Sequence, residues 1–213
     1  MSSRSSTKNG SPDGRLQRSV RSRQIILDAI VSLVEEGNLV PTAQQVAWRA
    51  GVGLRTVFRH FDDMEALFAE MDWKLADAHA RFFVGVDRTG PLAERIRAAT
   101  EQRDQAYEMV KYVILSSQVQ MWQSKTLRRN WARKRRELRQ DLENWFPEVK
   151  KLSESRQAAA EVAMCFETWY HLRYDQRLTH KETVASINEM LCLLFEVDPV
   201  LVARPALLYP AAL

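Results

Sequence analysis

The chain has 213 residues, of which 46% are hydrophobic and 27% are charged, and its formal net charge at pH 7 is +4. This length allows one or two domains with a real hydrophobic core, and the composition is that of an ordinary soluble protein rather than a disordered or fibrous one. No apolar run approaches the roughly 18 residues that cross a membrane, and the N-terminus lacks an apolar signal core, so we expect a cytoplasmic protein without membrane contact.

Positive charge gathers near the N-terminus. Residues 1–60 contain nine Lys or Arg against four Asp or Glu, whereas the charges of the remaining residues nearly balance. This polarity is expected of a chain whose N-terminal end binds DNA. The two cysteines, Cys165 and Cys192, lie in apolar runs without the spacing of a metal site, so we expect buried thiols in a reducing compartment, with a redox switch as the alternative.

The first predicted elements are an arm and a helix. Residues 1–20 are rich in Ser, Gly and Arg, so we expect a disordered basic arm; contact with the DNA minor groove is the alternative to plain disorder. From about Arg21 to Glu36, apolar residues recur at helical spacing, and Gly37-Asn38 ends the pattern. This predicts a first helix whose apolar face supports the elements that follow.

Two short helices joined by a tight turn are predicted between Thr42 and Phe61. Thr42 followed by Gln45 has the spacing of a capping box at a helix start. Small Ala47, then Gly51 four residues on, then apolar Val57, is the spacing of a helix-turn-helix. The second helix leaves its polar side chains pointing outward, and an exposed basic helix held rigidly by its neighbour suits the major groove.

Several short motifs carry a family resemblance. They are Arg23-x-x-Ile26-x-x-Ala29, Thr42-x-x-x-Val46-Ala47, Ala50-Gly51-Val52, Thr56-Val57-Phe58-Arg59-His60-Phe61 and Glu65-x-x-Phe68. With them, Ile25–Leu75 resembles the DNA-binding domain of the TetR family of bacterial transcription regulators. The chain departs from the family pattern at Gly53, Phe58 and Met64, where the family usually has Ser, Tyr and Lys.

The resemblance implies an all-α fold, with a three-helix helix-turn-helix domain followed by a helical domain for ligand binding and dimerisation. It also implies a homodimeric repressor that binds a palindromic operator in double-stranded DNA and responds to a small effector. Arg55 is the candidate for a guanine edge, because a guanidinium pairs with O6 and N7. The DNA-binding residues predicted are Thr42, Arg59 and His60 at phosphates, Leu54 and Phe58 in apolar contact with bases, and Thr56 beside them.

Beyond this segment the periodicity predicts only helices. A long helix at 63–83, opened by an Asp62-Asp63-Met64-Glu65 capping box, is expected to link a DNA-binding domain (21–66) to an effector-binding and dimerisation domain (67–213). As the one helix expected in both domains, it would carry the signal between them. The remaining helices are predicted at 91–102, 104–122, 125–145, 155–175 and 180–195, followed by an irregular tail at 197–213, with one short turn of helix in it as the alternative.

The last two of these helices carry apolar stripes wider than one neighbour can cover, so we expect them to form the four-helix dimer interface that the resemblance implies. The interface residues predicted are Val162, Phe166, Val184, Ile187, Leu191 and Leu194. The aromatic and methionine side chains of helices 104–122 and 155–175 are candidates for the walls of a pocket for an apolar or aromatic effector, with ordinary core packing as the alternative. The pocket residues predicted are Met109, Tyr112, Met164 and Trp169.

Other functions have less support in the sequence. The basic run 125–139 is interpreted as a solvated helix face, with a second nucleic-acid surface as the alternative. The four histidines form no metal-binding or catalytic pattern, and no Gly-rich phosphate loop is present, so we expect no enzymatic activity, metal or cofactor. Two rivals remain: a DNA-binding regulator without an effector, controlled by a protein partner or its abundance, and an all-helical enzyme.

Overall fold

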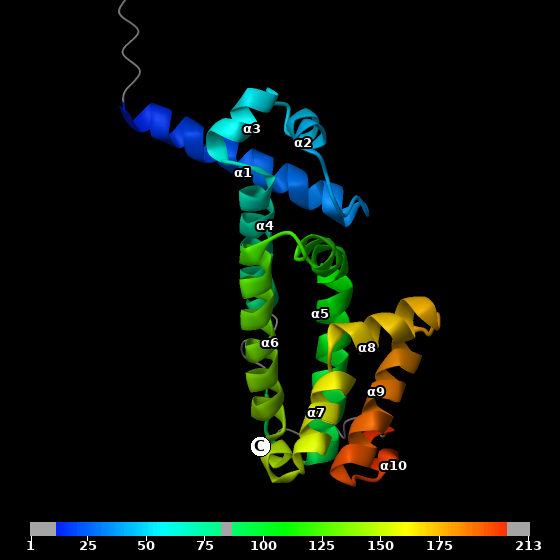
Figure 1. Ribbon diagram of the computed structural model, residues 1–213. Coiled ribbons are helices and arrows are strands. Elements are labelled where there is room, and N and C mark those ends of the chain that lie inside the picture. The colour runs from blue at the N-terminus through cyan, green and yellow to red at the C-terminus, as the bar shows by residue number, and fades with distance from the viewer. Residues whose placement is uncertain (1–11, 82–86, 204–213) are drawn as a thin grey trace, which may run out of the picture. The chain divides into compact units, whose positions relative to one another are not determined.

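The computed structural model describes residues 12–81 and 87–203, and of residues 12–15, 75–81 and 203 it describes the backbone alone. Across these residues the chain forms helices and turns without a strand, which confirms the all-α prediction (Figure 1). The α-helices are α1 (Pro12–Glu35), α2 (Ala43–Arg49), α3 (Leu54–His60), α4 (Met64–Arg81), α5 (Leu92–Gln120), α6 (Lys125–Trp145), α7 (Glu154–Ala163), α8 (Phe166–Tyr170), α9 (His180–Phe195) and α10 (Pro199–Ala203). A 3-10 helix, η1 (Pro147–Lys151), follows α6, and a π-helical turn, η2 (His171–Asp175), follows α8. None of the described helices is both long and apolar enough to cross a membrane.

The chain divides into two compact units, and the divisions fall inside helices. Unit 1 comprises Met1–Leu75 and Tyr112–Arg128, and unit 2 comprises Ala76–Lys111 and Arg129–Leu213. Helices α4, α5 and α6 therefore each contribute residues to both units. The long helix α4, predicted to be alone in joining the two domains, shares this role with two others.

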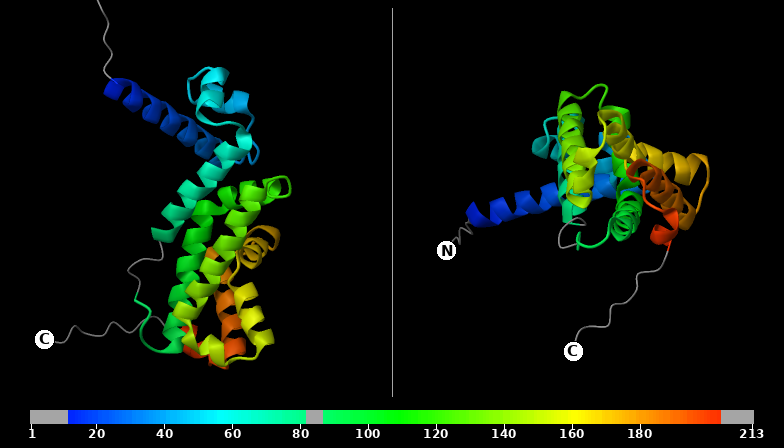
Figure 2. Two further views of the ribbon diagram at one scale, coloured as in Figure 1. Left: turned by 60° about the vertical axis from the view of Figure 1, so that its left-hand side comes forward. Right: turned by 90° about the horizontal axis from the view of Figure 1, so that it is seen from below.

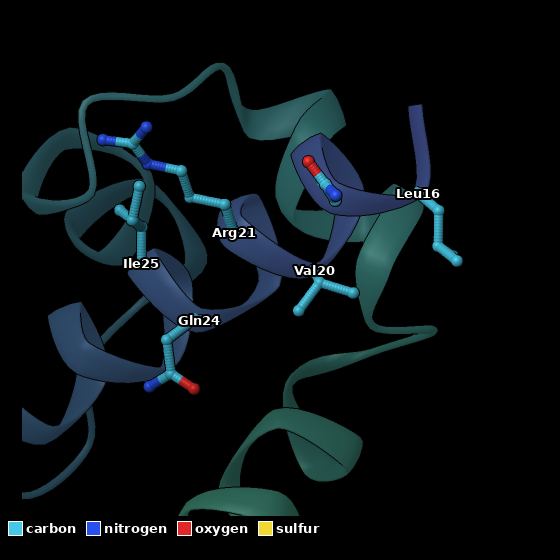
Figure 3. Close-up of a pocket in the computed structure, with 6 residues that line it drawn as sticks. Leu16, Val20, Arg21, Gln24 and Ile25 are labelled. Atoms are coloured by element: carbon cyan, nitrogen blue, oxygen red, sulfur yellow. The ribbon is translucent and has the colours of Figure 1, made fainter. Parts of the chain in front are cut away.

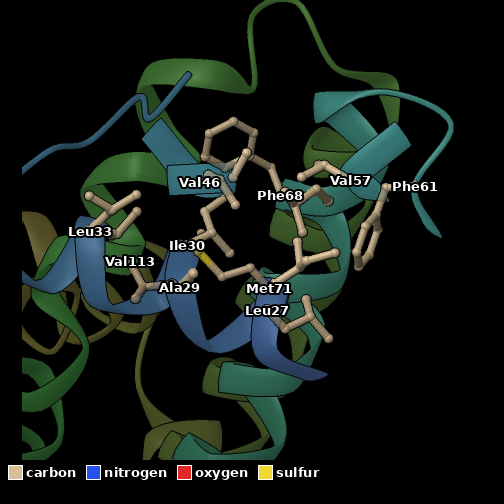
Figure 4. Packing of buried hydrophobic residues seen from close by; sticks show 14 residues of the cluster. Leu27, Ala29, Ile30, Leu33, Val46, Val57, Phe61, Phe68, Met71 and Val113 are labelled. Carbon is tan, nitrogen blue, oxygen red and sulfur yellow. The ribbon is translucent and has the colours of Figure 1, made fainter. Parts of the chain in front are cut away.

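Unit 1 is built around a core between α1, α2, α3 and the first part of α4 (Figure 4). Its buried side chains include Ile26, Ile30, Val34, Val46, Val57, Phe61, Leu67, Phe68 and Met71. Val113 of α5 belongs to the same core, although its helix begins in unit 2. The periodic residues of α1 thus support the two short helices after it, as their spacing predicts.

Small polar side chains hold the C-terminal end of α5 within unit 1. Ser116 Oγ donates to the carbonyl of Leu39 at 2.6 Å, and Ser117 Oγ donates to Asp72 Oδ1 at 2.9 Å. These hydrogen bonds attach α5 to the loop after α1 and to α4. The prediction of separate helices at 91–102 and 104–122 was wrong, because residues 92–120 contain no glycine or proline to end the helix, and α5 runs through 29 residues.

Helix α1 begins earlier than predicted. It starts at Pro12 rather than near Arg21, so residues 12–20, expected to be part of a disordered arm, are helical. Proline suits the first helical position, where its missing N–H and fixed φ carry no penalty. Residues 1–11 lie outside the described part. Along this extension, Leu16, Gln17, Val20, Arg21, Gln24 and Ile25 line a shallow, mainly apolar hollow (Figure 3).

Unit 2 contains a buried arginine at its centre. Arg103 is 3% exposed, and it donates to the carbonyl of Met164 at 2.9 Å and to Asp141 Oδ2 at 2.9 Å. Tyr107 OH donates to the same Met164 carbonyl at 2.9 Å. These bonds anchor the chain between α7 and α8 to α5. The helix predicted at 155–175 is accordingly broken here, and Cys165 caps α8 by accepting from the N–H of Thr168.

Helix α9 closes unit 2. Its start carries a capping box in which the Thr179 side chain accepts from the N–H of Glu182 and the Glu182 carboxylate accepts from the N–H of Thr179. Helix α7 packs along α9, and α10 follows against the far end of α9 (Figure 2). The described part of the tail thus contains α10, which agrees with the prediction of an irregular tail with one short turn of helix.

Candidate nucleic-acid interface

The turn between α2 and α3 has the geometry that the sequence predicts. The Thr42 hydroxyl accepts from the N–H of Gln45 at 3.3 Å, and Gln45 Oε1 accepts from the N–H of Thr42 at 2.8 Å, which confirms the capping box. After α2, Gly51 adopts φ +64°, a conformation that glycine reaches without strain. The N–H of Val52 then bonds to the carbonyl of Ala47 at 3.0 Å, so the turn is closed by the backbone. Buried Ala47 leaves room for the two helices to meet.

Helix α3 presents three narrow stripes around one anchored residue. Val57 is 1% exposed and fixes the helix to the core. Arg55 and Arg59 lie one turn apart and are exposed; neither makes an ion pair or hydrogen bond to another described side chain. Leu54 and Phe58 form a parallel apolar stripe, each 45% exposed. On the other flank, Thr56 and His60 are half-buried. The structure thus brings together all the predicted residues of α3 on one short helix.

Arg23 of α1 holds the C-terminal end of α3. Its Nη1 donates to the carbonyl of His60, its Nε donates to Glu70 Oε1 at 3.0 Å, and its guanidinium lies 4.3 Å from the centre of the Phe61 ring. One side chain therefore connects α1, α3 and α4. Arg23 was identified in the sequence as part of a motif, but the contacts that give it this role span 37 and 47 residues of chain. Periodicity does not predict such contacts.

Thr42 and His60, both predicted at phosphates, differ in how available they are. The hydroxyl of Thr42 is occupied by the cap of α2, although the residue itself is exposed. The pKa of His60 lies below its ordinary value, first because burial disfavours the imidazolium and second because Arg59 and Arg23 are nearby. His60 Nε2 is buried and has no hydrogen-bond partner among the described residues. In the protein without DNA, burial and the two nearby guanidinium groups therefore favour the neutral imidazole of His60.

A pH dependence of stability follows from His60. Between its lowered folded pKa and the ordinary value of about 6.5, the unfolded chain binds a proton that the folded chain does not. The stabilising contribution is thus present above about pH 6.5 and is lost as the pH falls through the folded pKa. Urea unfolding from pH 7.5 to 5 should show this loss for the wild type and a smaller one for His60→Gln. Equal pH slopes for the two proteins would contradict the assignment.

The structure does not bring together the four residues predicted to line an effector pocket. Met109 is 58% exposed, whereas Met164 and Trp169 are 2% and 0% exposed. Tyr112, at 36% exposed, belongs to unit 1. Trp169 Nε1 donates to Asp104 Oδ1 at 2.8 Å, and the second Asp104 oxygen lies 2.7 Å from Nδ1 of His180. Arg103 and Asp104 thus make buried polar contacts in unit 2 that helical periodicity does not predict.

The predicted dimer stripe faces two directions. Ile187, Leu191 and Phe166 are 3%, 0% and 4% exposed and lie inside the protomer, while Val184 and Leu194 are half-buried. Val162 of α7 is 60% exposed. Helix α9 exposes Leu193, at 71%, and Met190, at 36%. Of the six predicted residues, Val162 is therefore the one that is mostly exposed, whereas the exposed apolar residues Leu193 and Met190 of α9 were not among those predicted.

Helix α6 has a solvated basic face. Arg128, Arg129, Arg135 and Arg136 are exposed. Arg139 pairs with Glu161 at 2.5 Å, and Arg133 and Lys134 both lie within 4 Å of Glu137. Leu127, Leu142 and Trp145 are buried along the opposite side. This amphipathic arrangement agrees with the simpler of the two interpretations of the basic run.

The helix-turn-helix segment is similar to a known protein family. Residues 26–71 match the family model of bacterial regulatory proteins of the tetR family. A solved transcriptional regulator from Rhodococcus sp. Rha1 has a TM-score of 0.64 at 20% identity, covering 84% of this chain and 96% of that chain. A protein from Mesorhizobium loti MAFF303099 assigned to the TetR-family transcriptional regulators has a TM-score of 0.54 at 13% identity, covering 84% and 97%. No curated protein matches the chain. The family model thus matches α2, α3 and the helices that support them, so this segment is similar to the DNA-binding domain of the bacterial regulatory proteins of the tetR family.

Proposed function

We propose that the protein is a repressor that binds, as a homodimer, a palindromic operator in double-stranded DNA of the cytoplasm. The observation that carries the proposal is α3, a firmly anchored helix with two unpaired cations, Arg55 and Arg59, on its outer surface among the described residues. The major groove admits an α-helix, and arginine pairs with guanine edges and phosphates there. The DNA-binding residues proposed are Thr42, Leu54, Arg55, Thr56, Phe58, Arg59 and His60.

Selection of duplexes from a random pool with the purified protein tests this function. We expect an enriched inverted repeat whose half-site centres lie about 10 base pairs, or a multiple of that, apart. The double variant Arg55→Ala/Arg59→Ala is the matched control and should enrich no sequence. Failure of the wild type to enrich any sequence would contradict the proposed function, and a single asymmetric half-site would contradict the homodimer.

We place the dimer interface on the exposed surface of α7 and α9. The buried residues of the predicted stripe hold these helices in the protomer. Val162 and Leu193 are large apolar side chains that remain mostly exposed in unit 2. The support for this proposal is that α7 and α9 pack together and each exposes a large apolar side chain, which a second copy of the chain would cover. Ile187, Leu191 and Phe166 stabilise the two helices, and Val184 and Leu194 lie at the margin.

Charge placed at the exposed positions should separate the subunits. Val162→Glu with Leu193→Glu is expected to give a folded monomer in analytical ultracentrifugation at micromolar concentration, because desolvating two carboxylates in an apolar interface is costly. Met109→Glu, another exposed apolar position of unit 2, is the control and should remain dimeric. A wild-type monomer, or an unaltered dimer in the double variant, would contradict the assignment.

An effector response is proposed for unit 2, with a small apolar or aromatic molecule as the ligand and Met109, Met164 and Trp169 as candidate contacts. Its support is the group of aromatic rings around Trp169, where Tyr107 and Phe166 lie 5.7 and 5.6 Å from it between ring centroids. A ligand there would have to displace packed side chains. A panel of small apolar and aromatic compounds tests this proposal. For each compound we would measure the shift in the melting temperature of the protein and the release of bound DNA.

The alternative is a DNA-binding regulator without an effector, controlled by a protein partner or by its abundance. One observation favours it: Met164 and Trp169 are fully packed, and the polar atoms around them already have partners in Arg103, Tyr107 and Asp104. A panel that gives neither stabilisation nor DNA release would support this alternative and leave the DNA-binding proposal intact.

Signal transfer between the units is proposed to use α5 together with α4. Helix α5 carries Arg103 and Tyr107 in unit 2 and the hydrogen-bonding Ser116 and Ser117 in unit 1. A change in the first pair can therefore alter the second along one continuous helix. An effector can shift the equilibrium between the DNA-binding and the non-binding conformation only by as much as its affinities for these two conformations differ.

A further inference from the structure

The apolar stripe of α3 has no partner in the part of the chain that the structure describes. Leu54 and Phe58 are each 45% exposed, on a helix of seven residues in which Val57 already supplies the buried anchor. Two large apolar side chains beside two unpaired arginines cannot be explained by the core of unit 1. They lie on the surface that the proposed function directs at DNA.

The bases offer one apolar group to such a stripe. In the major groove the base edges present hydrogen-bond donors and acceptors. The 5-methyl group of thymine is apolar and forms no hydrogen bond. Phe58 has no hydroxyl, so its ring makes no hydrogen bond to a phosphate or a base edge; the same holds for Leu54. A methyl group is therefore the complementary contact for both side chains.

The spacing of the stripe also fits base pairs. Residues four apart on an α-helix are separated by about 6 Å along its axis. Successive base pairs are separated by about 3.4 Å, so Leu54 and Phe58 reach positions about two steps apart. Arg55 lies between them along the chain and Arg59 follows Phe58, which brings a guanine-pairing group and a phosphate-binding group close to both apolar contacts.

We propose that Leu54 and Phe58 recognise the 5-methyl groups of two thymines in each operator half-site, next to the guanine bound by Arg55. This inference rests on the proposed operator binding and adds a specificity that charge alone does not give. The Arg59 contact is common to every sequence, whereas the methyl contacts select thymine over cytosine and over uracil. Each half-site therefore contains thymines at positions about two base pairs apart.

Deoxyuridine substitution tests the inference directly, because it removes the methyl group and keeps every base-pair hydrogen bond. Starting from the operator obtained by selection, each thymine of a half-site is replaced in turn, and the Kd is measured by fluorescence anisotropy. For the wild type we expect about three- to ten-fold weaker binding at two positions and no change at the others.

Three variants assign the positions to side chains. Phe58→Ala should become insensitive to deoxyuridine at one of the two positions and Leu54→Ala at the other. Val40→Ala is the matched control, since Val40 is 49% exposed in unit 1 but lies outside α3, and it should keep both sensitivities. Circular dichroism and thermal unfolding verify that each variant is folded.

The outcomes separate the inference from the proposed function. Intact operator binding with equal affinity for thymine and deoxyuridine at every position overturns the inference alone, as does a selected half-site without thymine. A sensitivity that persists in both Phe58→Ala and Leu54→Ala overturns it as well. If no sequence is selected at all, the operator-binding proposal and the inference fail together.

Discussion

Arg55→Ala should weaken binding to the selected operator by about 1–3 kcal/mol and relax selectivity at one position per half-site. The reason is geometric: Arg55 points outward from a helix whose opposite side is fixed by Val57, so its guanidinium is free to pair with guanine O6 and N7. Fluorescence anisotropy with the operator and its single-base variants measures both effects.

Arg59→Ala is the matched control for this experiment. Arg59 is exposed one turn further along α3, and we expect it to bind a phosphate. Its removal should weaken all sequences alike and reduce the slope of log K against log salt by about 1 for each phosphate that the variant no longer neutralises. An Arg55→Ala protein that keeps both the affinity and the sequence preference of the wild type would contradict the assignment of Arg55.

Arg103→Ala should lower the free energy of unfolding by about 3–5 kcal/mol, as expected when one member of a buried ion pair is removed. Arg103 is 3% exposed, and its removal leaves the carbonyl of Met164 and the carboxylate of Asp141 each without one donor. Asp141 retains Arg88 at 2.7 Å, which places the expected cost toward the lower end of that range. Urea denaturation measures it.

Arg139→Ala provides the comparison for Arg103. Arg139 also pairs with a carboxylate, that of Glu161, but its side chain is 63% exposed. A surface pair of this kind contributes about 0–1 kcal/mol. If Arg103→Ala were no more destabilising than Arg139→Ala, then the Arg103 hydrogen bonds would not be what holds α5 to the chain between α7 and α8.

Local signals in the sequence predicted the helix-turn-helix well. The capping boxes at Thr42 and Thr179, the left-handed Gly51 and the inward Val57 each depend on residues within one or two helical turns. For such features, residues that are close along the chain are also close in space, so the sequence pattern predicts the contact. The cap before α4 was predicted less accurately: Asp63 accepts from the N–H of Ala66, while Glu65 accepts from Ser124 rather than completing a capping box.

Features that depend on distant residues were not predictable in this way. The break at Met164 exists because Arg103 and Tyr107, 61 and 57 residues earlier, bond to its carbonyl. Likewise, the periodicity of α9 marks Ile187 and Leu191 as one apolar stripe, but it does not say whether the protomer or a second copy covers them. In the structure the protomer covers them, and the more exposed apolar residue of this helix is Leu193.

The most direct test of the central claim is a crystal structure of the protein with its selected operator duplex. We predict that α3 of each subunit lies in the major groove and that the Arg55 guanidinium is within about 2.7–3.2 Å of guanine O6 and N7. Leu54 and Phe58 should contact thymine methyl groups beside it. A complex in which α3 lies outside the groove, or in which Arg55 contacts no base, would contradict the account.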